Sequence, residues 1–376
     1  MSRWDRGAGI LSHFTKESRD IMVNEKNLFK HLIEKLYKDN FLNEDELVFI
    51  LDNINIYGRD YLVKKADETR RKVYGTSVYM RGLIEISNYC KRQCKYCGIS
   101  ALNSNVHRYR LTLKDILECC EKGYNLGFRT FVMQGGEDSY FTDSILTNII
   151  LEIKRRYPDV AITISLGERD FLSYEKLLVA GADRYLLRHE TINEKLYNDI
   201  HMNSNYENRI KSLWDLKSIG YQIGAGFMVG IPNQRKSDLA KELLFLKELD
   251  PEMVGIGPFI PHKDTVYRDE SPGTLEDTIT MVALTRLFLP NALIPSTTAL
   301  ASIDENGREL GLKAGANVVM PNLSPVDMRK DYSLYDGKVS SGYEGAESRK
   351  LLEDRVCQAG YKVDMSRGDN IKWKTN

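Results

Sequence analysis

Eight short runs rich in apolar and β-branched residues recur between residues 82 and 322, and stretches with helical periodicity separate them. The runs are "GLIEISNYC", "RTFVMQGGE", "VAITISLGE", "DRYLLRHE", "YQIGAGFMVG", "MVGIGPFIPH", "ALIPSTTAL" and "ANVVMPN". Strands that alternate with helices form βα units and a parallel sheet. Eight such units over roughly 240 residues predict a complete (β/α)8 TIM-type barrel. An open doubly wound sheet is the structural alternative.

The two ends of the chain differ in pattern from this central part. "NLFKHLIEKLYKDN" places Leu28, Phe29, Leu32, Ile33 and Leu36 on one stripe, which indicates an amphipathic helix. "NEDELVFILDNI" begins with an asparagine, Asn43, suited to cap a helix. After residue 322 the periodicity fades until a final short helix. We therefore expect an N-terminal helical extension (1–78), the barrel (79–325) and an irregular C-terminal segment that closes the barrel (326–376).

The overall charge excludes some classes of partner. Lys plus Arg and Asp plus Glu number 53 each, so the chain has no basic footprint for nucleic acid. No apolar run approaches the length of a membrane span, and the N-terminus has no apolar stretch of signal-peptide length. These features predict a cytoplasmic protein that binds neither nucleic acid nor membrane. In that compartment clustered cysteines are more often metal ligands than disulfides.

Half of the six cysteines lie within eight positions, at Cys90, Cys94 and Cys97, where the first barrel strand ends. A structural zinc site would need a fourth ligand, for which only His107 is near. The pair Cys94 and Cys97 has the spacing of a redox motif, but the third cysteine and the barrel-end position argue against that use. A cubane iron–sulfur cluster fits best, because three thiolates leave one iron with open coordination.

The CxxxCxxC spacing resembles the motif of the radical SAM superfamily. The resemblance implies one oxygen-sensitive 4Fe–4S cluster, whose open iron chelates the amino and carboxylate groups of S-adenosylmethionine (SAM). Reduction then cleaves the sulfonium C–S bond and yields a 5′-deoxyadenosyl radical. The superfamily's aromatic residue before the third cysteine, which lies against adenine, is here Tyr96. "QGGED" resembles its Gly-rich element, with Gly135 and Gly136 offering backbone carbonyls to the methionyl amino group.

Several longer strings resemble one family within that superfamily. "DRYLLRHET", "MVGIGPFIPHKDT", "MVALTRLFLPNALIPSTTAL" and "GANVVMPN" are similar to the HydE family of FeFe-hydrogenase maturases, which are biotin synthase-like radical SAM enzymes with a complete barrel. The resemblance implies that Ser165, Glu190 and Arg209 complete the SAM site. A guanidinium can pair with the methionyl carboxylate, and a carboxylate can accept from ribose hydroxyls or an ammonium. The alternative for Arg209 is a solvated helix-face residue.

This resemblance also implies a reaction and partners. The substrate would be a small organometallic complex, an iron with CO, cyanide and cysteine, and the radical would attack the cysteine sulfur during assembly of the diiron subcluster. Partner maturases and a low-potential electron donor, flavodoxin or ferredoxin, would act with the chain. The alternatives are another biotin synthase-like reaction, of the methylornithine synthase or biotin synthase type, and a non-catalytic metal-binding protein.

A barrel that encloses a radical must hold its substrate on side chains projecting inward from the later strands. Arg188 has the same strand parity as Glu190 and could bind a carboxylate, unless it only pairs with a neighbouring carboxylate. The other expected pocket residues provide hydroxyls, soft sulfur walls and a cover: Thr297, Thr298, Met253, Met320, Tyr332 and Tyr335.

The remaining cysteines predict a single cluster. Some HydE proteins carry a second cluster on C-terminal cysteines, but this chain has Ser340 and Ser348 there and keeps only Cys357. We expect Cys119, Cys120 and Cys357 to be buried, inert thiols. Anaerobic reconstitution should therefore give about four irons per chain, measured by iron assay. An iron content near about six with a two-iron spectroscopic signal would contradict this ligand count.

Overall fold

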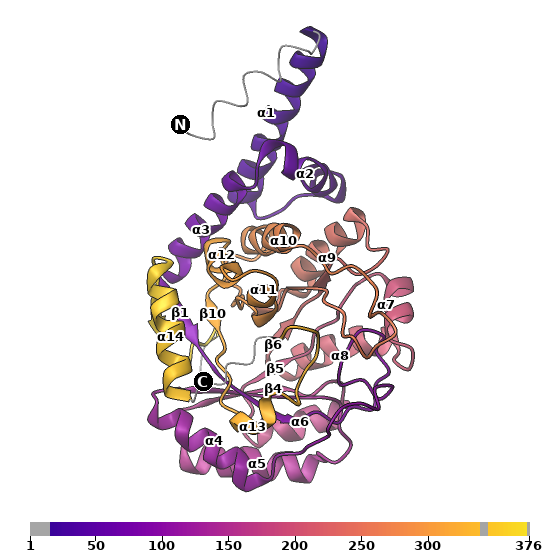
Figure 1. Cartoon of the computed structure of the whole chain (residues 1–376). Coiled ribbons are helices and arrows are strands. Elements are labelled where there is room, and N and C mark those ends of the chain that lie inside the picture. Colours follow the sequence, from indigo (N-terminus) through magenta and orange to yellow (C-terminus); the bar gives the residue numbers. More distant parts are fainter. Residues whose placement is uncertain (1–15, 339–344, 374–376) are drawn as a thin grey trace.

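The computed structural model describes residues 16–338 and 345–373, and the N-terminal helices project from a rounded body that holds the strands (Figure 1). These helices are α1 (Lys16–Asp39), α2 (Glu44–Tyr57) and α3 (Asp60–Tyr74). The cap of α2 is confirmed, because the Asn43 side chain accepts from the Glu46 N–H and the Glu46 carboxylate accepts from the Asn43 N–H. On α1 the predicted stripe is buried except for Leu28, which is exposed.

Six parallel strands form the main sheet in the order β2-β3-β4-β5-β6-β8. Each lies inside a run that the sequence predicts to be a strand. Their bounds are β2 (Gly82–Ser87), β3 (Thr130–Gly135), β4 (Ala161–Ser165), β5 (Arg184–Leu186), β6 (Gln222–Ala225) and β8 (Met253–Val254). Because the strands are parallel, their carboxyl ends meet at one face.

The seventh and eighth runs continue the ring beyond β8. Met253 forms a parallel bridge to Leu293, and Pro295 forms one to Val318 of β10 (Val318–Val319). The seventh run was expected to be a regular strand, but among the described residues it forms only these isolated bridges. Its proline cannot donate to a ladder, which limits regular pairing there.

The backbone of Leu83 closes the ring. The Leu83 N–H donates to the Pro321 carbonyl at 2.9 Å, and the Leu323 N–H donates to the Leu83 carbonyl at 2.7 Å. The chain after the eighth run is thus joined to the first strand. The predicted (β/α)8 barrel is confirmed, and the open doubly wound sheet is excluded.

Two runs expected to be continuous strands are each divided. After β6 the chain turns at Gly226 (φ +155°) and resumes as β7 (Met228–Val229), and β9 (Gly257–Pro258) follows β8 and pairs with β7. A Cβ on Gly226 would lie 2.0 Å from the Gly255 carbonyl oxygen, so the two divided strands approach too closely there for any side chain.

Further elements surround the barrel. Strands β1 (Ser77–Met80) and β11 (Lys362–Asp364), which the sequence patterns did not reveal, join β10 in a parallel sheet of order β10-β1-β11. The helices are α4 (Leu113–Asn125), α5 (Asp143–Arg156), α6 (Phe171–Val179), α7 (Glu194–Ile200), α8 (Tyr206–Ile219), α9 (Lys236–Leu249), α10 (Leu275–Phe288), α11 (Thr298–Ile303), α12 (Gly307–Lys313), α13 (Val326–Arg329) and α14 (Gly345–Gln358). The domain boundaries at 78 and 325 remain predictions.

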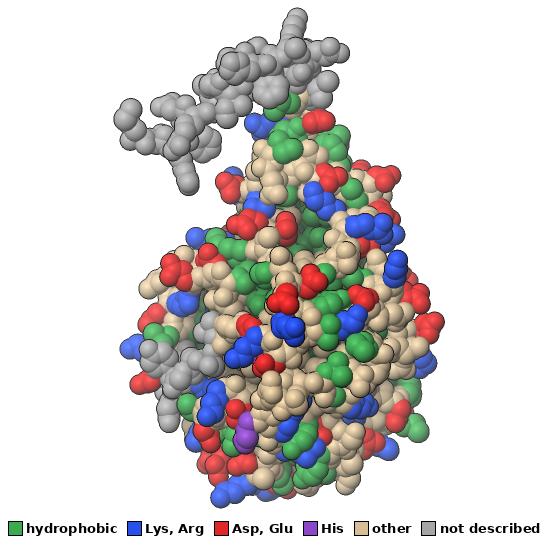
Figure 2. Space-filling view, turned by 45° about the vertical axis from the view of Figure 1, so that its right-hand side comes forward, with side chains coloured by type: hydrophobic (Ala, Val, Ile, Leu, Met, Phe, Trp, Pro, Cys, Tyr) green, Lys and Arg blue, Asp and Glu red, His purple; other side chains and the backbone are tan. Residues whose placement is uncertain are grey.

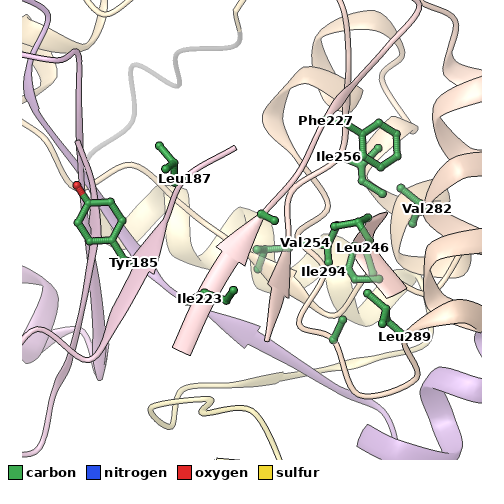
Figure 3. Packing of buried hydrophobic residues seen from close by; sticks show 14 of the residues in the cluster. Tyr185, Leu187, Ile223, Phe227, Leu246, Val254, Ile256, Val282, Leu289 and Ile294 are labelled. Atoms are coloured by element: carbon green, nitrogen blue, oxygen red, sulfur yellow. The ribbon is translucent and has the colours of Figure 1, made fainter. Parts of the chain in front are cut away.

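The core lies between the strands and the outer helices. Figure 3 shows Ile223 and Val254 on neighbouring strands and Leu246 and Val282 on the helices beside them, all buried. On the face seen in Figure 2, acidic and basic side chains are interspersed rather than gathered by sign. No helix within residues 16–338 and 345–373 is long and apolar enough to cross a membrane.

Residues 367–370 cover the amino ends of the barrel strands. Arg184 and Gln222, which begin β5 and β6, donate to the Asp369 carboxylate at 2.6 and 2.8 Å. Arg81, just before β2, donates to the Gly368 carbonyl at 3.1 Å. Both arginines are buried. Burial alone would raise the pKa of Asp369, but Arg184 and Arg367 outweigh it and lower the pKa below its usual range.

Replacing this carboxylate should destabilise the barrel. Asp369→Asn leaves Arg184 buried without its counter-charge, and we expect a loss of roughly 3 kcal/mol in the free energy of unfolding. Asp52→Asn, in an exposed pair with Lys236, is the control and should cost about 0–1 kcal/mol.

The sign of the pH dependence follows from the lowered pKa. The stability that Asp369 contributes is fully present above the ordinary aspartate pKa of about 3.9 and is lost as the pH falls through the lower folded-state pKa. Urea unfolding should therefore show a constant difference between wild type and Asp369→Asn above about pH 5 that shrinks below about pH 4. A difference that grows in acid would contradict the assignment.

Candidate active site

A cavity of about 350 Å³ lies at the carboxyl ends of the barrel strands. All the predicted site residues except Met253 line it: Cys90, Cys94, Tyr96, Cys97, Gly135, Gly136, Ser165, Arg188, Glu190, Arg209, Thr297, Thr298, Met320, Tyr332 and Tyr335. The sequence order scatters these residues over nearly 250 positions, so the closed barrel is what brings them together.

The cysteines lie on an irregular loop that follows β2. A half-buried arginine, Arg108, stabilises the conformation of this loop. The Arg108 guanidinium donates to the backbone carbonyls of Ile99 and Ser100 at 2.8 and 2.7 Å, and also to those of Asn88 and Asn103. A loop without regular structure has unpaired carbonyls that need donors. Sequence reasoning missed Arg108, which has no motif around it.

The three thiols suit a cluster better than a single ion. Burial raises the pKa of Cys97 to about 12 and raises those of Cys90 and Cys94, so these groups stay protonated until a cation replaces the protons. Among the described residues no three His, Cys, Asp or Glu side chains converge on one ion position. A 4Fe–4S cluster takes each thiolate on a different iron, so thiols spread around a cavity fit it.

The Gly-rich turn after β3 packs directly against the cysteine loop. A Cβ on Gly136 would lie 2.2 Å from the Tyr89 carbonyl oxygen and 2.6 Å from Cys90 Cβ. The Lys91 N–H donates to the Glu137 carbonyl at 3.0 Å. Only glycine at position 136 allows this approach, which joins the first two strand ends of the site.

Four charged side chains, two buried and two half-buried, form a network beside the cavity. Arg92 donates to Glu137 at 2.5 Å and to Glu168 at 3.0 Å, and Arg209 donates to Glu168 at 2.6 Å. The network separates the cavity from an outer groove of about 740 Å³ that the same glutamates line. Burial alone would raise the pKa of Glu168, but Arg209 and Arg92 lower it, so the carboxylate is charged. The polar "GERD" string at the end of the third run could have revealed Glu168.

Arg209 is not a solvated helix-face residue. Its side chain is buried, and its Nη1 donates to the Arg188 carbonyl at 2.9 Å. Burial alone would lower its pKa, but Tyr197 and the carboxylates of Glu168, Glu137 and Glu190 raise it. Its Nη2 is 3.5 Å from Glu137 Oε1, which is long for a hydrogen bond. Nη2 can therefore still donate to a ligand in the cavity.

Arg188 and Glu190 follow β5, at the carboxyl end of the fourth run, and the Glu190 carboxylate lies beside the Arg188 guanidinium. The Arg188 Nη2 is 3.2 Å from Glu190 Oε2 and also donates to the Phe227 carbonyl at 2.8 Å. Glu190 has a positive φ of 65°, which an ordinary L-residue adopts at a cost of about 1–2 kcal/mol. Its buried Oε2 accepts no hydrogen bond of good geometry, and Arg188 Nε has no hydrogen-bond partner. The pair therefore keeps unsatisfied polar atoms inside the cavity wall.

Tyr96 is held by a histidine that sequence reasoning missed. The Tyr96 hydroxyl is 3.1 Å from His201 Nε2, and its ring meets Phe259 with centroids 6.2 Å apart. Burial, with a smaller effect of Arg209, lowers the pKa of His201 to about 3, so the imidazole is neutral and can accept from the phenol.

The expected pocket residues line the cavity, with one exception, and their contact with a substrate stays a prediction. Thr297 Oγ1 is buried and has no hydrogen-bond partner, and the Tyr332 hydroxyl accepts from Gln134 Nε2 at 3.2 Å. The prediction that Met253 forms a pocket wall is wrong, because Met253 does not line the cavity. It lies on β8, and its sulfur is 3.1 Å from Arg81 Nη1.

The other cysteines are partly as expected. Cys119 and Cys120 are buried in α4, but Cys357 lies exposed on α14, so its predicted burial is wrong. Ser340 lies outside the described residues, as does the side chain of Ser348, and the single-cluster prediction stays a prediction.

Comparisons with known proteins agree with this geometry. The family model described as the radical SAM superfamily matches residues 84–279. The FeFe-hydrogenase maturase subunit HydE of Thermotoga maritima is 46% identical over 313 residues, which cover 82% of this chain and 88% of that one. The 3-methylornithine synthase of Methanosarcina barkeri is 29% identical over 82% of this chain and 87% of its own length. A solved methylornithine synthase superposes with a TM-score of 0.75 at 25% identity, covering 89% and 97%.

The barrel, the cysteine loop and the family match define a radical SAM enzyme, which works with a 4Fe–4S cluster and SAM. At 46% identity over four-fifths of its length, the chain belongs to the HydE family of that superfamily.

The close packing of the Gly-rich turn on the cysteine loop can be tested by one methyl group. Gly136→Ala must push the Cys90 backbone aside at a cost of about 1–3 kcal/mol, so we expect reduced cluster incorporation on reconstitution, measured as iron per chain. Gly255→Ala is the matched control, because Gly255 lines the same cavity but its Cβ would meet nothing closer than 3.8 Å. Equal iron contents in the two variants would contradict the packing argument.

Proposed function

We propose that Cys90, Cys94 and Cys97 hold the 4Fe–4S cluster and that SAM lies between this cluster and Glu190. The observation that carries the proposal is the convergence of the three thiols, the Gly-rich turn and the Arg209–Glu190 wall on one cavity. When bound, the cluster and SAM supply a 5′-deoxyadenosyl radical through reductive cleavage of the sulfonium bond.

The chain's own groups bind and orient SAM. Arg209 Nη2, which Glu137 holds only weakly, donates to the methionyl carboxylate. Glu190 Oε2, which lacks a good hydrogen bond, accepts from ribose hydroxyls or from the ammonium. The Tyr96 ring, fixed by His201 and Phe259, lies against the adenine. Gly135, Gly136 and Ser165 complete this half of the cavity.

We infer that the chain acts in the assembly of the diiron subcluster of FeFe-hydrogenase. The likeness to the HydE of Thermotoga maritima supports this role. The substrate is an iron complex with CO, cyanide and cysteine, delivered by a partner maturase, and the cysteine sulfur is the atom attacked. A flavodoxin or ferredoxin supplies the electron.

The later strands provide the substrate half of the cavity. Thr297 and Thr298 offer hydroxyls, Met320 a polarizable wall, and Tyr332 and Tyr335 a cover. Arg188 Nη2 pairs with Glu190, so its contact to the substrate carboxylate is through the other guanidinium nitrogens, of which Nε is buried without a partner.

The proposed function is tested with the anaerobically reconstituted protein. It should cleave SAM under reductant, and with partner maturases it should activate hydrogenase apoprotein. Cys94→Ala should abolish cleavage while the circular dichroism of the barrel is kept. Cleavage without hydrogenase activation, together with methylornithine formation, would assign the chain to the methylornithine synthase type of reaction.

The unpartnered hydroxyl of Thr297 gives a sharp test of the substrate half. Thr297→Val removes a group that makes no hydrogen bond within the described protein, so stability, cluster content and SAM affinity should stay unchanged. Hydrogenase activation should fall on the order of tenfold, the effect of one lost hydrogen bond of about 1.4 kcal/mol.

Thr163→Val is the matched control, because its hydroxyl is also buried and unpartnered but does not line the cavity. It should leave activation unchanged. Equal activation by both valine variants would remove Thr297 from the substrate site.

A further inference from the structure

Residues 331–338, which we call the strap, cross the carboxyl end of the barrel. The Gly98 N–H in the cysteine loop donates to the Leu334 carbonyl at 2.8 Å. Near β9 the Asp336 N–H donates to the Pro261 carbonyl at 3.2 Å, and the Lys263 N–H donates to the Asp336 carboxylate at 2.7 Å. These contacts attach the strap to the cysteine loop after the first run and to the end of the sixth run, both at the barrel mouth.

The strap forms part of the cavity wall. Tyr332, Leu334, Tyr335 and Lys338 all line the cavity that holds the three cysteines. Its position above the cysteine loop is tight, because a Cβ on Gly98 would lie 2.1 Å from the Ser333 carbonyl oxygen. The residue directly after Cys97 must therefore be glycine for the strap to lie where it does.

One ion pair joins the strap to the interior of the barrel. Lys338 Nζ donates at 2.6 Å to Glu85 Oε1 and at 2.6 Å to the Tyr332 carbonyl. Glu85 projects from β2 and is fully buried, and its other oxygen accepts from Asn322 Nδ2 at 2.8 Å. A buried carboxylate is costly without a counter-charge, and here the counter-charge lies on the strap. Moving the strap away would leave Glu85 uncompensated.

We propose that Lys338 is a positioning residue that holds the strap closed over the cavity through Glu85. Closure places the Tyr332 and Tyr335 walls beside the substrate and excludes external reductants and hydrogen-atom donors from the radical. The inference rests on the proposed function only in taking this cavity as the place of the radical reaction. Sequence reasoning missed both members of the pair, because neither belongs to a motif.

Hydrogen exchange tests the closure directly. In Lys338→Met the amides of Lys263 and Asp336 should exchange on the order of tenfold faster or more, because the buried pair that opposes opening is lost. Glu85→Gln should have the same effect from the other partner, and Lys338→Arg should largely restore protection. Lys330→Met, an exposed lysine just before the strap, is the control and should exchange like wild type.

A second measurement follows the function of the closed strap. In the reconstituted enzyme without substrate, Lys338→Met should form 5′-deoxyadenosine several-fold faster than wild type. An open mouth lets the external reductant reach the radical, which takes one electron from the reductant and one proton from water. Its KM for the substrate should rise more than its kcat falls. Lys338→Arg should return both quantities toward wild type.

The outcomes separate this inference from the proposed function. Exchange is measured before and after reconstitution, so it gives a result even if a variant fails to load the cluster. Wild-type exchange at Lys263 and Asp336 in both Lys338→Met and Glu85→Gln would overturn the inference. If wild type fails to activate hydrogenase while the variants lose protection, the proposed function falls and the strap closure stands.

Discussion

The hydrogen bonds of Leu83 with Pro321 and Leu323 are the constraint on which the site depends, because they close the ring of parallel strands. Ring closure puts all the carboxyl ends at one mouth, and most groups of the candidate site come from such an end. Arg209 reaches the mouth from α8, and Tyr332 and Tyr335 reach it from the strap. An open sheet would leave the cysteine loop after the first run and the threonines after the seventh at opposite edges. The cavity exists because a few backbone bonds join the eighth run to the first.

Charges inside the barrel occur in compensated sets, each with its own task. At the amino end, Asp369 neutralises Arg184. At the carboxyl end, Arg92 and Arg209 hold two glutamates, and Lys338 holds Glu85. The pair of Arg188 and Glu190 differs from these sets, because each of its two members keeps a buried polar atom without a hydrogen-bond partner. Unsatisfied polar groups are expensive in a buried site, and both members of this pair line the cavity, which supports the proposal that they bind a ligand.

The sequence predicted what depends on local pattern and missed what depends on tertiary contact. Seven of the eight strand runs contain regular parallel strands, and the cysteine and glycine motifs meet in one cavity, because period and motif are local properties. Met253 was misplaced, since strand parity does not tell how deep in a barrel a side chain lies. Arg108, His201 and Lys338 were missed, because their partners are distant in sequence and lone polar residues carry no pattern.

The C-terminal segment contacts the barrel at both ends and along its side, and this explains how a radical site can be sealed without a second domain. Lys338 pairs with Glu85 at the carboxyl end, Arg355 pairs with Glu309 on the outer wall, and Asp369 pairs with Arg184 at the amino end. Each contact joins a charge on the segment to one on the barrel. The segment is thus held in register by these ion pairs together with apolar packing, because Leu352, Val356 and Tyr361 are buried in the core. Such registration can be released at one end while the others hold, which is what a mouth that opens for substrate requires.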